Sequence, residues 1–85
     1  MKRKKRIENI LSNNFKSWTI EVIDISQQHK GHNHFSGNNE THFSIILHNN
    51  NNENFKRIDI HRKINFLLKE ELSAGLHALE IIIKN

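Results

Sequence analysis

The spacing of the apolar residues switches between two periods along this chain, and this alternation constrains the fold more than any other feature. Near the start, Ile7, Leu11 and Phe15 fall on one stripe of a short helix, and helical spacing returns near the end. The segments between and after these stretches alternate polar with apolar residues, which is typical of β-strands. The sequence therefore predicts a helix over 3–14, strands over 17–26 and 41–48, a helix over 57–73 and a strand over 77–84.

This order of elements predicts a single α+β domain over residues 1–85, with the succession α-β-β-α-β. Its helices would pack on one face of a three-stranded mixed sheet. The first two strands are expected to pair, because consecutive strands usually lie side by side. If the last strand lies beside the first in parallel, its crossover should be right-handed. A chain of 85 residues can bury only one modest core, and we expect the isolated protein to be a monomer.

The composition indicates the cellular compartment in which the protein works. The chain contains no cysteine, which fits a reducing compartment. No apolar run approaches the roughly 20 residues that cross a membrane, and the charged start lacks the apolar segment of a secretory signal. We therefore expect a cytoplasmic protein that does not bind membranes.

The net charge of +4 is concentrated in one basic segment at the start, which consists of Lys2, Arg3, Lys4, Lys5 and Arg6. The sequence favours a solvated end that frays. The alternative is an arm that contacts nucleic acid or an acidic partner through its positive charge.

Histidine is unusually frequent, with seven residues in a chain without cysteine. His29, His32 and His34 form an HxxHxH cluster within a polar stretch that predicts a long loop. Neutral imidazole is a common metal ligand, but this spacing alone does not distinguish ligands from solvated histidines. In strand 41–48, His42 has the parity of the solvent face. His77 instead shares the parity of the apolar residues that follow it, so the pattern favours a buried, hydrogen-bonded histidine over a ligand.

Nothing in the sequence indicates an enzyme. The chain has no nucleophile paired with a base in a known motif and no glycine-rich phosphate loop. Asp24 and Glu40 would form a pair of carboxylates only in a geometry that the sequence does not supply. A GxxG clamp, which an RNA-binding domain of the KH type would need between its helices, is also absent.

Five segments of the chain resemble the BolA family and occur in the family's order over nearly the whole length: "RIENIL", "EVIDIS", "ETHFSI", "HRKINFLLKEEL" and "GLHALEI". The resemblance implies a KH-like α+β fold. It also implies partnership with a monothiol glutaredoxin of the CGFS type, with which the protein would share a [2Fe-2S] cluster. Glutathione would complete the ligands, and no cofactor is expected in the isolated protein.

The resemblance also assigns the cluster ligands of this chain. The family motif D-x-S-x-x-[H/C] matches Asp24, Ser26 and His29, and the histidine of the terminal "HAL" is His77. The long loop offers His32 and His34 as rivals to His29. Two imidazoles in place of thiolates reduce the negative charge around a cluster and should raise its reduction potential. The implied role is an adaptor in iron–sulfur trafficking or iron homeostasis.

A DNA-binding transcriptional regulator is the second interpretation, because such a role is also attributed to BolA proteins through their KH-like fold. The basic start and four further cationic residues favour it: Lys56, Arg57, Arg62 and Lys63. The missing GxxG clamp weakens it. Ile60 also stands where many family members have a basic residue.

Overall fold

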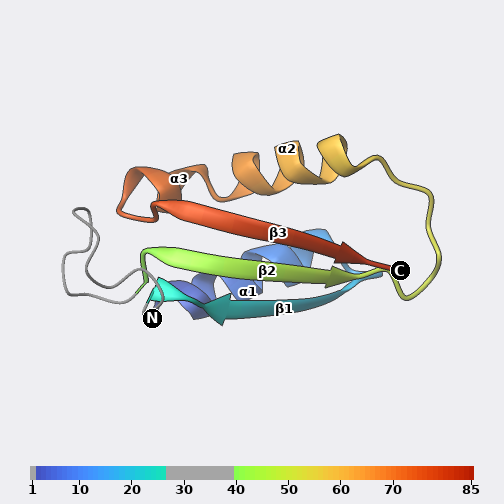
Figure 1. The fold of residues 1–85 in the computed structure, drawn as a ribbon, viewed down its shortest axis with the longest axis horizontal. Helices are drawn as coiled ribbons and strands as arrows, with labels where there is room; N and C mark the ends of the chain where they lie inside the picture. The colour runs from blue at the N-terminus through green and yellow to red at the C-terminus, as the bar shows by residue number, and fades with distance from the viewer. Residues whose placement is uncertain (1, 27–39) are drawn as a thin grey trace.

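A computed structural model describes residues 2–26 and 40–85 of the chain. Its elements are α1 (Arg3–Asn14), β1 (Thr19–Asp24), β2 (His42–His48), α2 (Arg57–Leu67), α3 (Lys69–Ser73) and β3 (Ala78–Lys84), as Figure 1 shows. The predicted α+β class and order of elements are confirmed, and α1 has the predicted bounds. The strands begin one or two residues later than predicted, and the second predicted helix is divided in two.

The three strands form one mixed sheet in the order β1-β2-β3. β1 pairs with β2 in antiparallel, with Val22 opposite Ile45, and β3 pairs with β2 in parallel, with Ile81 opposite Ile45. The parallel neighbour of the last strand is therefore β2, not the first strand that the sequence led us to consider. A physical reason lies in burial, because β2 contains no exposed residue whereas β1 and β3 each contain several. The strand without an exposed residue takes the central position.

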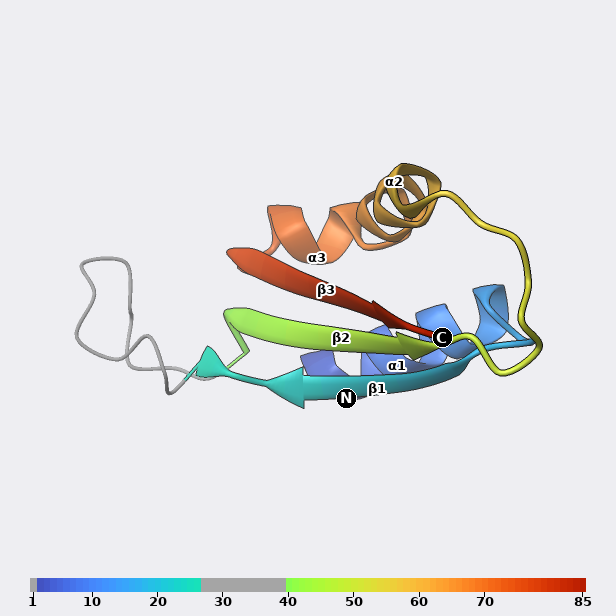
Figure 2. The same cartoon turned by 45° about the vertical axis from the view of Figure 1, so that its right-hand side comes forward.

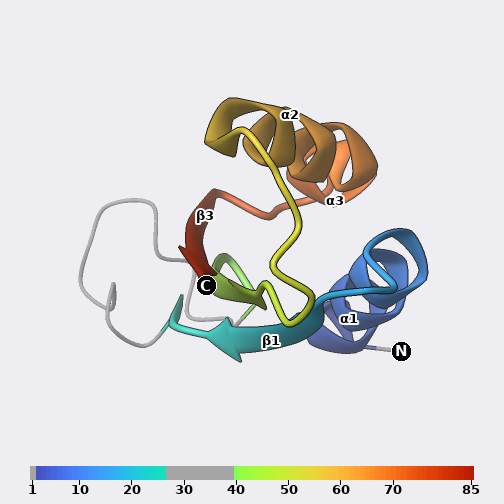
Figure 3. The ribbon, with the colours of Figure 1, turned by 90° about the vertical axis from the view of Figure 1, so that its right-hand side faces the viewer.

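All helices lie on the same side of the sheet (Figures 2 and 3). The core between them contains Phe43, Ile45 and Leu47 of β2, each without exposed surface, as the alternating pattern predicted. His42 points to the opposite face, as predicted, and His48 shares that face; both are half-buried. On that face the ring of His48 lies 3.4 Å (Nε2 to Oε1) from the carboxylate of Glu21.

The break between α2 and α3 falls at Leu68, whose backbone angles are φ −101° and ψ 15°. Leu68 and Ile64 have no exposed surface, whereas Leu67 is half-buried at the edge of the core. The break thus occurs where the chain buries a side chain between two helical segments that point in different directions (Figure 2). Gly75, with φ +120°, follows the end of α3.

The connection from β2 to α2 begins with a buried asparagine. Asn49 accepts a hydrogen bond from Glu53 N through Oδ1 (2.9 Å) and donates one to Glu53 O through Nδ2 (2.9 Å). The first residue of the asparagine run therefore closes a turn in which both polar atoms of its side chain are satisfied.

The prediction of a solvated basic start is wrong for two of its residues. Arg3 and Arg6 ion-pair with the buried Glu71 of α3 at 2.8 and 2.7 Å, and the side chain of Arg3 is only 11% exposed. Lys4 and Lys5 are exposed, as predicted. Across residues 2–26 and 40–85, no helix combines the length and the apolar character that crossing a membrane would require.

Candidate functional site

The candidate site lies at the end of the sheet where β2 and β3 begin, and it contains His77. His77 precedes the first residue of β3, and its backbone N–H donates to Thr41 O at 2.7 Å. The residue is exposed, so the expectation of a buried structural histidine is wrong. Regular pairing with β2 starts only at Ala78, and the strand parity therefore does not extend back to His77.

The imidazole of His42 is the neighbour of the His77 imidazole, with ring centroids 6.0 Å apart and planes at 37°. One ring nitrogen of His42, Nδ1, lies 2.9 Å from the hydroxyl of Thr41. Sequence reasoning placed His42 on the solvent face but did not bring it to His77. The missing information was the parallel register, which sets His42 opposite Ala78.

Asp24 and Ser26, the first two residues of the family motif, connect the segment before residue 27 with the segment after residue 39 through hydrogen bonds. The hydroxyl of Ser26, a residue without exposed surface, donates to Asp24 Oδ1 (2.5 Å) and accepts from Thr41 N (3.0 Å) and His42 N (3.2 Å). Asp24 Oδ2 also accepts from Glu40 N at 3.2 Å. These bonds fix the backbone of Thr41 and His42, and Thr41 O in turn holds His77.

The predicted loop ligand and its rivals lie outside the described residues, so the structure does not test them. These residues are His29, His32 and His34. The structure therefore places one of the two predicted ligands, His77, and brings His42 to it.

Charged side chains lie beside this end of the sheet without forming a pair of carboxylates. The carboxylate of Glu40 accepts a hydrogen bond from the backbone N–H of Arg3 (2.6 Å), whereas that of Asp24 accepts from Ser26 and from Glu40 N. On α3, the hydrogen bond from Arg6, together with that from Arg3, holds the pKa of the Glu71 carboxyl below its ordinary value. The same contact raises the pKa of Arg6. Both groups are therefore charged across the neutral range.

The described parts of the chain offer too few ligands for a complete metal site. Among residues 2–26 and 40–85, no three His, Asp or Glu side chains come close enough together to hold a metal ion. Structural metal sites usually have four protein ligands.

The four predicted nucleic-acid-binding residues are all exposed but differ in their contacts. Lys56, Arg57 and Arg62 are exposed at the start of α2 and along it. Lys63, however, donates from Nζ to Asn14 O at 3.1 Å, and its ammonium lies 4.6 Å from the centroid of the Phe15 ring. It therefore faces the end of α1.

Phe66 was missed by sequence reasoning and is 65% exposed on α2. The Nζ atom of Lys69 lies 4.3 Å from the centroid of its ring. The signal was present in the sequence, because Phe66 stands outside the apolar stripe that Ile60, Ile64 and Leu68 form.

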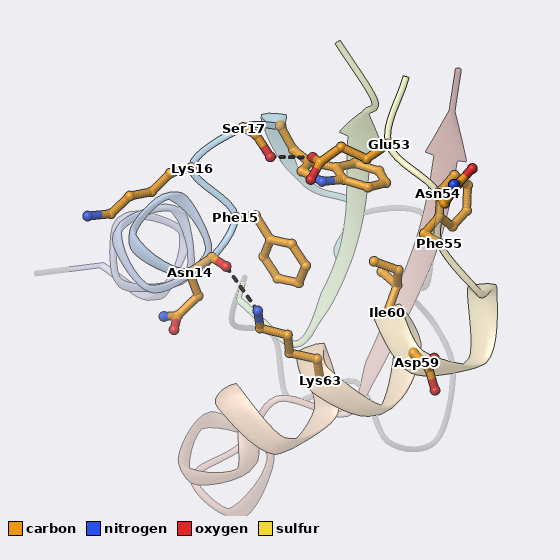
Figure 4. A pocket seen from close by; sticks show the side chains of 11 residues that line it. Asn14, Phe15, Lys16, Ser17, Glu53, Asn54, Phe55, Asp59, Ile60 and Lys63 are labelled. Atoms are coloured by element: carbon orange, nitrogen blue, oxygen red, sulfur yellow. Dashed lines mark hydrogen bonds between the residues drawn. The ribbon is translucent and has the colours of Figure 1, made fainter. Parts of the chain in front are cut away.

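A pocket of about 280 Å³ lies at the opposite end of the sheet, between the end of α1 and the start of α2 (Figure 4). Phe15, the residue after α1, points into it, and Trp18 packs edge-to-face against Phe55 with centroids 5.3 Å apart. Polar groups at its rim bond to one another, as in the hydrogen bond from Ser17 Oγ to Glu53 Oε2. Aromatic packing, rather than a cluster of potential ligands, characterises this end.

The sequence has relatives along almost its whole length. A family model described as "BolA-like protein" matches residues 2–85. The chain is 42% identical over 76 residues to an uncharacterized protein in the cobS 5' region of Sinorhizobium sp., covering 88% of this chain and 82% of that protein. It is 34% identical over 84 residues to the chloroplastic protein BOLA1 of Arabidopsis thaliana, covering 96% of this chain but only 52% of that protein.

Solved structures give the same result for the fold. The BolA domain of SufE1 from Arabidopsis thaliana matches with a TM-score of 0.79 and 34% identity, covering 99% of this chain and 92% of that one. The structure of BolA1 from the same plant matches with the same values. Within the full-length SufE-like protein 1, chloroplastic/mitochondrial, the matched region is 22% of the protein, so the domain there is part of a longer chain.

Proposed function

Because this chain belongs to the BolA-like protein family, we propose that it is a non-enzymatic adaptor for a monothiol glutaredoxin of the CGFS type. The two proteins would share a [2Fe-2S] cluster in iron–sulfur trafficking or iron homeostasis. The observation that carries this proposal is the exposed residue His77 at the end of the sheet, whose backbone N–H donates to Thr41 O and whose ring lies beside that of His42. We further propose that the protein is cytoplasmic and a monomer when isolated.

The donor chemistry of this end fits a shared cluster. His77 would hold the cluster from this chain together with His29, while the cysteine of glutaredoxin and glutathione would supply thiolates. When bound, such a cluster provides a one-electron redox centre whose potential depends on its ligands. The bonds of Asp24 and Ser26 support the role of His29 indirectly, because they fix the chain three residues before it.

The residues of this chain would present the imidazole of His77 in a fixed position. Its backbone N–H donates to Thr41 O, and its ring lies 6.0 Å, centroid to centroid, from that of His42, a contact that would restrict the rotamers of both. Preorganised ligands lose less conformational entropy when the partner docks. His42 would therefore orient His77, much as outer groups orient the ligands of other metal sites.

Mixing the protein with cluster-loaded monothiol glutaredoxin tests the proposal. We expect a new visible absorption and circular-dichroism spectrum, and we expect His77→Ala to alter that spectrum while the isolated protein remains folded. His61→Ala is the matched control, because it also removes an exposed imidazole but from α2. A folded His77→Ala protein that forms an unaltered complex would sink the ligand assignment.

A second candidate function is DNA binding by a transcriptional regulator. It is favoured by the exposure of Arg57 and Arg62 on α2, with the exposed ring of Phe66 on the same helix. Lys63 supports it less, because its ammonium already contacts Asn14 and Phe15. Binding to duplex DNA should weaken steeply with salt, and Arg62→Ala should reduce that salt dependence by about one phosphate contact. Binding that Arg62→Ala leaves unchanged at every salt concentration would rule out this surface.

A further inference from the structure

The guanidinium of Arg3 contacts both segments of backbone that hold His77, although the two segments are far apart in the sequence. Arg3 begins α1, and this end of α1 lies at the same end of the molecule as α3 (Figure 1). We infer that Arg3 is a positioning residue for the candidate site, because it joins the chain before Thr41 to the turn before His77. The inference deepens the proposed function and rests on it for its relevance to cluster binding.

The first contact is with Glu40, the residue at which the described chain resumes before β2. The backbone N–H of Arg3 donates to Glu40 Oε1 at 2.6 Å, and its guanidinium donates to the backbone carbonyl of Glu40. Glu40 has φ +79°, a conformation that costs energy for a residue with a side chain. Bonds to both the side chain and the carbonyl oxygen hold Glu40 in that conformation and so fix the direction in which Thr41 follows.

The second contact is with the turn between α3 and β3. Arg3 Nη2 donates to Ala74 O at 2.9 Å. The guanidinium lies so close to Gly75 that a Cβ atom there would be 3.4 Å from Nη2. This turn leads directly into His77, whose N–H donates to Thr41 O at 2.7 Å. Arg3 therefore binds the backbone just before each partner of the hydrogen bond between His77 N and Thr41 O, at Glu40 on one side and at Ala74 on the other.

The geometry requires an arginine rather than a positive charge alone. The guanidinium donates to Glu71 Oε1 (2.8 Å) through Nε, to Glu40 O through Nη1 and to Ala74 O through Nη2. A lysine ammonium is a single point of charge and cannot reach three acceptors arranged around a planar fork. Arg6 provides a comparison, because it shares the carboxylate of Glu71 through Nε and Nη2.

Amide hydrogen exchange in the isolated protein tests the inference without any partner. In Arg3→Met, we expect the exchange rates of the Thr41 and His77 amides to rise by about tenfold or more relative to the core of β2, the factor that corresponds to losing one charged hydrogen bond. Arg6→Met should raise them much less, although it also breaks an ion pair with Glu71. Arg3→Lys should behave like Arg3→Met, and it carries the test by itself if Arg3→Met does not fold.

Two results would overturn the inference at this stage. One is amide exchange in Arg3→Lys that is as slow as in the wild-type protein, which would mean that a positive charge at this position is enough to hold His77. The other is an equal increase of the exchange rates in Arg3→Met and Arg6→Met, which would mean that Arg3 acts only through its ion pair with Glu71.

The complex with cluster-loaded monothiol glutaredoxin then tests the link to function. Arg3→Lys should alter the visible circular dichroism of the complex and shorten its lifetime, whereas Lys5→Ala, which removes an exposed charge from the same helix, should change neither. An unaltered complex of Arg3→Lys would overturn the positioning role. If the wild-type protein forms no such complex, the proposed function fails, and the exchange rates still decide whether Arg3 positions His77.

Discussion

The two ends of the sheet are built by different physical means. At the end that carries His77, polar groups dominate: the buried hydroxyl of Ser26 and the guanidinium of Arg3 bond backbone atoms of segments that are distant in sequence. At the opposite end, Phe15 and Trp18 pack against one another with ring centroids 6.4 Å apart, next to the hydrogen bonds that Asn49 and Ser17 form with Glu53. Hydrogen bonds have preferred lengths and angles, whereas apolar contacts are non-directional. A polar network can therefore fix the backbone next to an exposed side chain such as that of His77 more closely than apolar packing alone would.

The largest effect should come from the core that both ends share. Leu68→Ala should lower the free energy of unfolding by about 2–5 kcal/mol, because it leaves a cavity at a residue without exposed surface. Leu67→Ala, at a half-buried neighbour, should cost clearly less. Urea unfolding of both variants measures the difference. Equal losses would show that the break at Leu68 does not place the two leucines as described.

A pair of serines tests the comparison between the ends directly. Ser26→Ala should cost about 1–3 kcal/mol, because it leaves the amides of Thr41 and His42 without their acceptor in a buried position. Ser17→Ala, which breaks a hydrogen bond to Glu53 at the rim of the pocket, should change stability by less than about 0.5 kcal/mol. Thermal unfolding followed by circular dichroism suffices. Equal losses of unfolding free energy in the two variants would contradict the difference between the two ends.

The smallest effect concerns acid. Because the pKa of Glu71 is lowered in the folded protein, its carboxylate adds stability that is fully present above the ordinary carboxyl pKa and is lost as pH falls through the lowered value. We expect the free energy of unfolding to decrease with acidification in this range. Glu71→Gln should make that dependence shallower, as urea unfolding at a series of pH values would measure. An unchanged pH dependence would mean that the ion pairs with Arg3 and Arg6 do not contribute to stability.

The elements of the fold could be predicted because each one follows from local spacing. The stripe of Ile7 and Leu11 predicted α1, and the alternation around Phe43 and Ile45 predicted β2, because the two periods are set by backbone geometry. The break at Leu68 could not be predicted, since no Gly or Pro marks it and the surrounding core decides where the helix turns.

The candidate site was predicted only in part. The resemblance to the BolA family selected His77. The alternation of the last strand wrongly predicted that His77 is buried, because regular pairing with β2 begins only at the next residue, Ala78. His42 was assigned to the correct face of the sheet, but its contact with His77 was not predicted. Arg3 was grouped with the solvated lysines around it, since its acceptors, Glu40 and Ala74, are 37 and 71 residues away in the sequence.

The sequence by itself determined the periods, and with them the α+β class, the order of the elements and the side chains that form the core. Only the tertiary structure decided which strand takes the centre and which distant groups meet at the end of the sheet. The reason is that spacing along the chain reports how each element distributes its own side chains. The parallel register of β2 and β3, the contact between His42 and His77, and the bonds of Arg3 all depend on how separate elements pack, which no local period contains.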